Sequence, residues 1–450
     1  MRPLYAILKI LLPYIYNILF RKKEMVNVPK KYKNQTIYVS NHPSAFLDPL
    51  LVASVGKPIV TFMTRSDVFT WWMKPITWAC NMIPIYRAEQ DGSGTYDKNQ
   101  EVFSAAQNVL KKRGNLIMFA EGYTDDVFIR SLKPIKKGPA RIAFGTMEAT
   151  DWSIDLKVQA VGINYANPGM MRSDVVIKWG EPIRMQDLKE MYDENPNKAT
   201  LHLTKAISKG IQENIIYVED KSKADFVDHL FILTRKGMHY KHSDRSIPLI
   251  QRNEYARSLA NRVNNEFTDE AADWEDLKNS TEAYFNELNK RNLDEEFVFN
   301  YSASGNKKKS LKNWLFLLLT LPLFLFGCIH HAFPYIITKK MVEKMFKRQV
   351  FWSGVKVVLG GIIWMFYTLP VFWLFNSYVY PEIGIDNYWI GFTISLIYYL
   401  VVPYFSFLFW YRWINVFKET MAYGKADENA LKEMSVNRAE LIQKITKMNI

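Results

Sequence analysis

A histidine and an aspartate share one short stretch of this chain, "YVSNHPSAFLDPLLV", which runs from Tyr38 to Val52. Five residues separate His42 from Asp48, and both follow an apolar run. A hydroxyl group is a poor nucleophile until a base removes its proton. Histidine can do this near neutral pH, and a carboxylate can orient the ring and stabilise the imidazolium. The pair could therefore activate a hydroxyl for attack on an acyl carbonyl. The alternative is a surface or structural histidine in an ordinary turn.

More polar residues follow at the ends of later apolar runs. Arg87 ends "MIPIYRA", and Glu121 and Gly122 come directly after "NLIMFA". The segment "RSLKPIKKGPARIAFG" adds a basic series: Arg130, Lys133, Lys136, Lys137 and Arg141. Cations near a His/Asp pair suit an anionic substrate such as a phosphate. The basic run could equally be a solvated face or a patch at a membrane surface.

These residues need a scaffold, and residues 30–185 have the pattern of an α/β domain. The segments "QTIYVSN", "PIVTFM", "NLIMFAEG" and "KVQAVGINY" are short β-branched or aromatic runs that end in turns. Helical patterns lie between them, such as "DKNQEVFSAAQNVLKKRG". This alternation favours a parallel or mixed sheet flanked by helices, whose site lies past the carboxyl ends of the strands. His42 and Glu121 both occupy such positions.

The rest of the chain is expected to be helical. Residues 186–300 have helical periodicity and mixed charge, and we expect them to pack on the α/β domain. "YSASGNKKKS" at 301–310 reads as a linker, and residues 425–450 read as a polar helical tail.

Three long apolar segments within residues 311–418 indicate a membrane protein. Residues 313–338, 357–381 and 387–411 contain no Asp, Glu, Lys or Arg, and each is long enough to cross a hydrocarbon core of ~30 Å. The net charge of +13 suits anionic lipid or nucleic acid. The basic residues are spread through membrane flanks without a nucleic-acid-binding motif, so we expect no nucleic-acid partner.

Charge around these segments predicts their orientation. Lysines flank residues 313–338 on both sides, which places both flanks in the cytoplasm and predicts a re-entrant hairpin, interrupted by Pro322, His330, His331 and Pro334. Three full spans are the alternative. Residues 1–25 predict a retained helix in the membrane interface, or else a single span. With only two cysteines, the chain suits a catalytic part on the cytoplasmic face, at the inner membrane if the source is bacterial.

The order of the polar blocks resembles a known family. "NHPSAFLDP", "IPIYR", "FAEG" and "VQAVGI" resemble, in order, the four sequence blocks of the glycerophosphate and lysophospholipid acyltransferase superfamily. The resemblance covers residues 30–185. The longer His-to-Asp spacing resembles yeast-type glycerol-3-phosphate acyltransferases.

The resemblance implies a concrete activity. His42 would be the base that deprotonates a glycerol-backbone hydroxyl, and Asp48 would orient it. The hydroxyl would attack the thioester of acyl-CoA or acyl-carrier protein, and no metal or redox cofactor would be needed. Arg87 would bind the acceptor's phosphate, and Glu121 and Gly122 would shape that site.

Three departures from the family pattern bear on the acceptor. The spacing between His42 and Asp48 is one residue longer than usual, the arginine that commonly follows the third block is absent, and Ala160 replaces a proline. Arg130 or Lys137 could supply the missing charge. The acceptor is expected to be glycerol-3-phosphate or 1-acyl-glycerol-3-phosphate. The alternatives are another lysophospholipid or lyso-aminolipid, or a membrane scaffold without activity.

Overall fold

The computed structural model describes residues 2–71, 73–86, 95–268, 270–306 and 311–450. The chain forms two compact units. The first comprises Met1–Val227 and Lys236–Glu266, and the second comprises Asp228–Arg235 and Phe267–Ile450.

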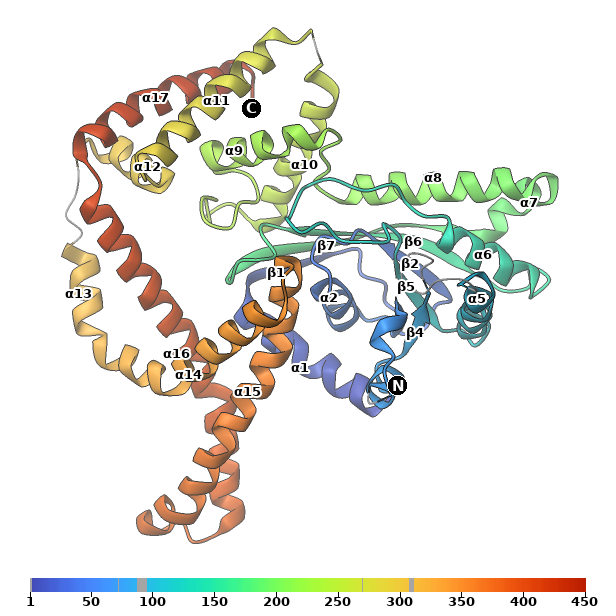
Figure 1. Ribbon diagram of the computed structural model, residues 1–450, viewed down its shortest axis with the longest axis horizontal. Helices are drawn as coiled ribbons and strands as arrows, with labels where there is room; N and C mark the ends of the chain where they lie inside the picture. The colour runs from blue at the N-terminus through green and yellow to red at the C-terminus, as the bar shows by residue number, and fades with distance from the viewer. Residues whose placement is uncertain (1, 72, 87–94, 269, 307–310) are drawn as a thin grey trace. The chain divides into compact units, whose positions relative to one another are not determined.

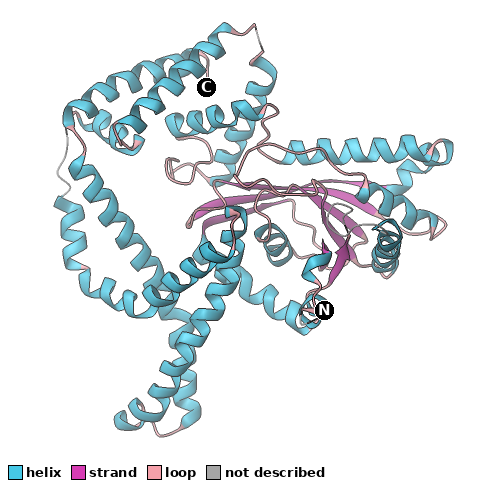
Figure 2. Cartoon of the chain, in the orientation of Figure 1, coloured by secondary structure: helices cyan, strands magenta, loops and turns pink. Residues whose placement is uncertain are grey.

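The first unit contains a mixed sheet of seven strands, drawn in magenta in Figure 2. The strands are β1 (Phe20–Val26), β2 (Thr36–Ser40), β3 (Val60–Arg65), β4 (Met82–Ile85), β5 (Asn115–Phe119), β6 (Lys157–Tyr165) and β7 (Ser173–Arg184). Their order is β1-β7-β6-β2-β5-β3-β4. All neighbours are parallel except β6 and β7. The predicted α/β class with a mixed sheet is confirmed, and each of the four predicted strands is present.

Helices cover both faces of this sheet, with α8 and α2 on opposite sides (Figure 1). They are α1 (Pro3–Leu19), α2 (Leu47–Val55), α3 (Lys74–Ala79), α5 (Thr95–Lys111), α6 (Gly138–Glu148), α7 (Lys189–Glu194), α8 (Pro196–Asn214) and α10 (Leu249–Glu266). Helix α9 (Ala224–Thr234) contains the boundary between the units, and short 3-10 helices occupy Ser66–Val68, Met185–Leu188 and Lys221–Lys223. Ile37 and Val39 of β2 are fully buried in one core with α5, α6 and α8. Their spacing of two residues is what puts both on one face of the strand.

The N-terminal helix is shorter than the predicted 1–25 because residues 20–26 form strand β1. Tyr16 and Leu12 are buried, whereas Ile10 and Leu11 on the other side of α1 are exposed. Lys9 is a charged residue within α1. Its ammonium donates to the carbonyls of Ala53, Gly56 and Pro58 at the end of α2, where a cation satisfies carbonyls that lack helical partners.

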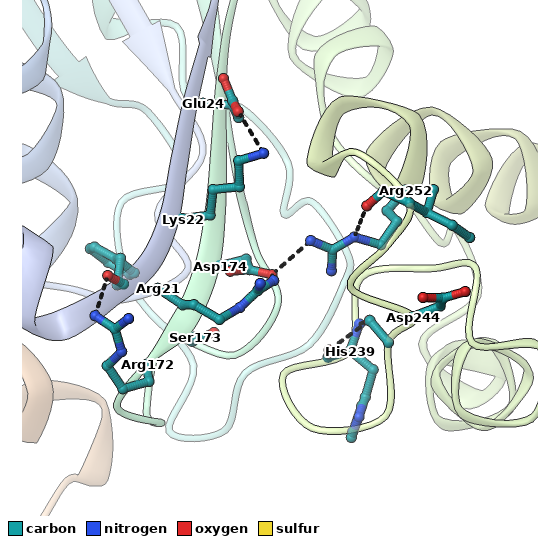
Figure 3. Close-up of polar contacts among 12 residues, drawn as sticks. Arg21, Lys22, Glu24, Arg172, Ser173, Asp174, His239, Asp244 and Arg252 are labelled. Atoms are coloured by element: carbon teal, nitrogen blue, oxygen red, sulfur yellow. Dashed lines mark hydrogen bonds and ion pairs between the residues drawn. The ribbon is translucent and has the colours of Figure 1, made fainter. Parts of the chain in front are cut away.

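Strand β1 is held at the edge of the sheet by an ion-pair cluster. Asp174 of β7 lies between Arg21 of β1 and Arg252 of α10 (Figure 3). Asp174 accepts from Arg252 Nη2 at 3.0 Å, and both side chains are almost fully buried. Arg21 thus adds a second cation to a buried carboxylate that Arg252 already pairs, and this contact links β1 to β7.

The second unit is helical. Its elements are α11 (Ala272–Lys290), α12 (Glu295–Ser304), α13 (Leu311–Leu319), α14 (Leu321–Met345), α15 (Trp352–Leu374), α16 (Tyr388–Lys425) and α17 (Glu428–Lys447), with a π-helix at Phe375–Val379 and 3-10 turns at Gln349–Phe351 and Pro381–Ile383. Helix α17, the predicted tail, packs on α11 and α12. The expected helical region 186–300 is thus divided, since α8 and α10 belong to the first unit and α11 and α12 to the second. The expected linker begins inside α12 and includes residues outside the described part of the chain.

Three helices of this unit are long and apolar enough to cross a membrane: Leu321–Met345, Gln349–Val379 and Tyr388–Lys425. The first predicted apolar segment breaks at Thr320, and Pro322 lies in the first turn of α14, where proline is readily accommodated. The histidines and Pro334 lie inside α14 instead of interrupting it. His330 Nε2 lies 2.9 Å from the Tyr398 hydroxyl of α16, which gives its ring a polar partner within the helix pair. Whether this segment re-enters or crosses stays a prediction.

Candidate active site

Three neighbouring parallel strands bring the polar residues together. β2 lies between β5 and β6, and Ser40 is paired with Phe119 on one side and Val161 on the other. Parallel strands end at the same edge of a sheet, so the residues just after β2 and β5 and the last residue of β6 lie side by side. These residues are His42, Glu121 and Tyr165.

His42 and Asp48 are in contact despite the five residues between them. His42 Nδ1 lies 2.8 Å from Asp48 Oδ2. The aspartate side chain is fully buried, whereas the histidine side chain is 20% exposed and its ring stacks on Phe119 at 4.4 Å. With Nδ1 directed at the carboxylate, Nε2 is the nitrogen that remains to take a proton from a substrate.

The extra residue is absorbed by a tight turn before α2. Ala45 has a φ of 39°, in the left-handed region, and the amide of Leu47 donates to the carbonyl of Ser44 at 2.9 Å. Helix α2 then starts at Leu47, which puts Asp48 in its first turn. The positive end of the helix dipole favours a carboxylate there. The Ser44 amide also donates to Asp48 Oδ2 at 2.8 Å, so the turn itself holds the aspartate.

Two residues that sequence reasoning missed complete this arrangement. The Tyr165 hydroxyl donates to Asp48 Oδ1 at 2.9 Å. Burial, followed by the nearby Asp48 charge, raises the pKa of Tyr165 well above its usual value, so the hydroxyl keeps its proton and remains a donor. Asn41 extends the β2–β6 ladder, because its amide side chain exchanges hydrogen bonds of 2.8 and 3.0 Å with the backbone of Ile163. In the sequence, the sign that could have identified Asn41 and Tyr165 was their position at the end of a predicted strand.

Glu121 links the turn that contains His42 to the basic loop, the segment after β5 that contains Lys133. Its Oε1 accepts from the His42 amide at 2.6 Å, and its Oε2 accepts from the Lys133 amide at 3.2 Å. Burial raises the pKa of this carboxyl, and the two backbone hydrogen bonds and the Lys133 charge oppose the shift. Gly122 follows with a φ of 84°, a conformation that side chains disfavour, and this lets the chain turn away after β5.

The other predicted binding residues have different surroundings. The Arg130 guanidinium is buried and donates to the carbonyls of Tyr165, Ala166 and Met238. Lys137 is exposed and precedes the first residue of α6. Arg87 lies outside the described residues. Of the basic loop, it is Lys133 that has a buried ammonium beside Glu121, with Nζ 4.0 Å from Oε2.

A pocket opens beside the histidine. Its polar side includes His42, Glu121 and Lys133, and its apolar wall includes Phe128 and Ile216. The lining of the pocket therefore combines polar and apolar side chains.

Comparison with known proteins agrees with this geometry. Residues 17–163 match the family model named Acyltransferase. Residues 17–163 form an acyltransferase domain. The predicted resemblance to the glycerophosphate acyltransferase superfamily is confirmed. The matched segment of the acyltransferase domain contains His42, Asp48, Glu121 and the first part of β6.

Two curated relatives from Saccharomyces cerevisiae are similar to parts of this chain. Glycerol-3-phosphate O-acyltransferase 2 is 32% identical over 114 residues, which is 25% of this chain and 15% of the relative. Glycerol-3-phosphate O-acyltransferase 1 is 25% identical over 253 residues, 55% of this chain and 32% of the relative. The chain thus spans a third or less of the length of these relatives. Among solved structures, the 1-acyl-sn-glycerophosphate acyltransferase PlsC from Thermotoga maritima matches with a TM-score of 0.32 and 17% identity, over 47% of this chain and 83% of that chain.

Proposed function

We propose that this protein transfers a fatty acyl group from acyl-CoA or acyl-carrier protein to a hydroxyl of glycerol-3-phosphate or 1-acyl-glycerol-3-phosphate. The observation that supports this most directly is the His42–Asp48 pair, buried on the aspartate side and open to a pocket on the histidine side. Relatives named glycerol-3-phosphate O-acyltransferases support the class of acceptor.

The proposed reaction needs one base and one leaving thiol. His42 Nε2 takes the proton of the acceptor hydroxyl while the oxygen attacks the thioester carbonyl. The tetrahedral intermediate then collapses, the C–S bond breaks, and the thiolate takes the proton back from Nε2 to leave as a free thiol. Asp48 stabilises the imidazolium between these two proton transfers.

We also propose that the reaction takes place at a membrane surface. Three long apolar helices in the second unit suit an integral membrane protein, and the lysines around them favour a catalytic domain on the cytoplasmic face. The exposed apolar face of α1 suits contact with the interface of the bilayer. An acylated product is amphipathic, so release into a bilayer avoids exposing its acyl chain to water.

One difference from the family's third sequence block supports a second class of acceptor. Thr124 and Asp125 follow "EGY" where the family commonly has an arginine. A site with less positive charge would suit a lysophospholipid with a larger headgroup, or a lyso-aminolipid.

The test is an acceptor panel with the purified full-length protein. Labelled acyl-CoA and acyl-carrier protein would each be supplied with glycerol-3-phosphate, its 1-acyl form, a lysophosphatidylcholine, a lyso-aminolipid and a phosphate-free monoacylglycerol. We expect transfer to the glycerophosphates and at least about a hundredfold loss of kcat in His42→Ala, since general-base catalysis is worth that much. His202→Ala, an exposed histidine of α8, is the matched control. Full activity of His42→Ala would remove the base from this mechanism, and equal rates on phosphate-free acceptors would remove the phosphate role of Arg87.

A further inference from the structure

The basic loop after β5 contains a buried lysine in an unusual position. The Lys133 side chain is 6% exposed, and its ammonium lies 2.9 Å from Asp125 Oδ2 and 3.1 Å from the Tyr123 carbonyl. The ammonium also lies over the Tyr123 ring at 4.3 Å. Lysine is seldom this buried without a specific partner or use.

The carboxylate that faces this lysine is shared. Asp125 is 34% exposed, and its Oδ2 lies 3.8 Å from the ammonium of Lys221 as well as 2.9 Å from that of Lys133. Two ammonium groups thus converge on one oxygen of a partly exposed carboxylate. Asp125 and Lys133 both line the pocket that contains His42, whereas Lys221 lies outside the lining and reaches it only through its contact with Asp125.

The other candidate cations of the loop are placed differently. Arg130 also lines the pocket, but three backbone carbonyls already accept from its guanidinium, so a ligand would have to compete with them. Lys137 is exposed and is not among the residues that line the pocket. Lys133 is the lysine whose charge is both buried and at the pocket wall.

We propose that Lys133, with Lys221, binds the phosphate of the acceptor, and that the phosphate takes the place beside these lysines that the Asp125 carboxylate occupies in this structure. This inference rests on the proposed function, because it assigns the charge that a glycerophosphate acceptor requires. A phosphate offers the same oxygen chemistry as a carboxylate with more negative charge, so it is the stronger partner for two ammonium groups.

The test separates binding from catalysis. In Lys133→Met, we expect KM for glycerol-3-phosphate to rise about tenfold or more, because a charge-assisted hydrogen bond is lost. The loss on a phosphate-free acceptor should be several times smaller than the loss on glycerol-3-phosphate. Lys112→Met is the matched control, because Lys112 is exposed and precedes β5, at the opposite edge of the sheet. An unchanged KM, or equal losses on both kinds of acceptor, would overturn the proposal.

A second variant covers the case in which Lys133→Met does not fold. Asp125→Asn removes the competing carboxylate and keeps the lysine, so we expect KM for glycerol-3-phosphate to fall by severalfold. The double variant Asp125→Asn/Lys133→Met removes both charges of the pair and should show the weak binding of the single Lys133 variant. A purely structural ion pair predicts no fall in KM for Asp125→Asn, and that result would also overturn the proposal.

Binding can be followed without activity. Glycerol-3-phosphate and inorganic phosphate should each raise the Tm of the wild type and of Lys112→Met, but not that of the double variant. If the wild type transfers no acyl group yet shows this pattern, the proposed function fails while the phosphate site stands. If the wild type is active and the double variant still binds phosphate normally, the site assignment fails while the proposed function stands.

Discussion

The hydroxyl of Tyr165 offers a sharp test of how the catalytic pair is held. Asp48 is fully buried, and two of its three protein donors, the Ser44 amide and His42 Nδ1, bond to Oδ2. Oδ1 accepts from Tyr165 at 2.9 Å. Tyr165→Phe therefore removes the donor on one side of the carboxylate and leaves the ring of the side chain in place.

The expected magnitude follows from the kind of bond that is lost. A hydrogen bond to a charged group contributes about 1.5–3 kcal/mol, and each ~1.4 kcal/mol corresponds to a tenfold change in rate. The free energy of unfolding should fall by about 1.5–3 kcal/mol. Only part of this loss is specific to the transition state, so we expect kcat to fall about tenfold. KM should stay within about twofold, because the hydroxyl is directed at Asp48 and not at the substrate.

Steady-state kinetics with saturating acyl donor, together with thermal unfolding, check this prediction. Tyr38→Phe is the matched control, because Tyr38 lies in β2 and its buried hydroxyl bonds to Asn34, before the start of that strand. This control should lose stability by about 0.5–1.5 kcal/mol, as for a neutral hydrogen bond, and keep its kcat. If Tyr165→Phe also keeps its kcat and only loses stability, Tyr165 does not position the catalytic pair and the reasoning is refuted.

Three further predictions follow from other contacts. Ala45→Gly should change stability by less than about 1 kcal/mol, because relief of a left-handed backbone offsets lost methyl burial, whereas Ala45→Val should lower both Tm and kcat. The pKa of Glu121 is raised from 4.5 in the folded protein, so the contribution of this residue to stability falls as the pH rises above 4.5. The wild type should therefore exceed Glu121→Gln in Tm by more at about pH 4 than at about pH 7. A difference that does not change with pH would contradict the shift. In the second unit, Arg438→Met should lower the free energy of unfolding by about 2 kcal/mol, because Glu295 loses its 2.6 Å partner in a buried site while Arg235 stays at 3.3 Å. Arg291→Met, at the exposed pair with Glu433, should lower Tm by much less, and equal shifts in Tm would contradict this.

Two of the predicted strands, β2 and β6, have nearly all of their residues buried on both faces. β2 and β6 are rich in β-branched and aromatic residues and lie in the middle of the sheet, where such runs are favoured. β1 was not predicted because its "RKKE" stretch is polar, and it forms a strand only where Arg21 finds Asp174 of β7. β4 is four residues long and contains Pro84, so it has too little pattern to detect, and it lies at the edge of the sheet.

The residues of the site also differ in how far the sequence could predict them. His42 and Asp48 are close in the sequence, so their spacing could suggest a pair. Tyr165 is 117 residues from Asp48, and the contact exists only because β6 pairs in parallel with β2. Lys133 stood among several cations in the sequence, and nothing in that run distinguishes the buried ammonium from exposed Lys137. Burial and register are properties of the folded chain, and they decide which members of a polar cluster can act.

The His-to-Asp spacing shows why counting residues is a weak guide to geometry. The position of Asp48 is set by the start of α2 and by donors from two separate segments, the Ser44 turn and the end of β6. His42 is set by β2 and by Glu121, which accepts from its amide. His42 is thus fixed from outside the loop that joins the pair, and Asp48 is held both by Tyr165 outside the loop and by the Ser44 amide within it, so the loop must close between them. A single left-handed residue, Ala45, is enough for that, so a sixth-position aspartate can meet the histidine as long as these outside contacts persist.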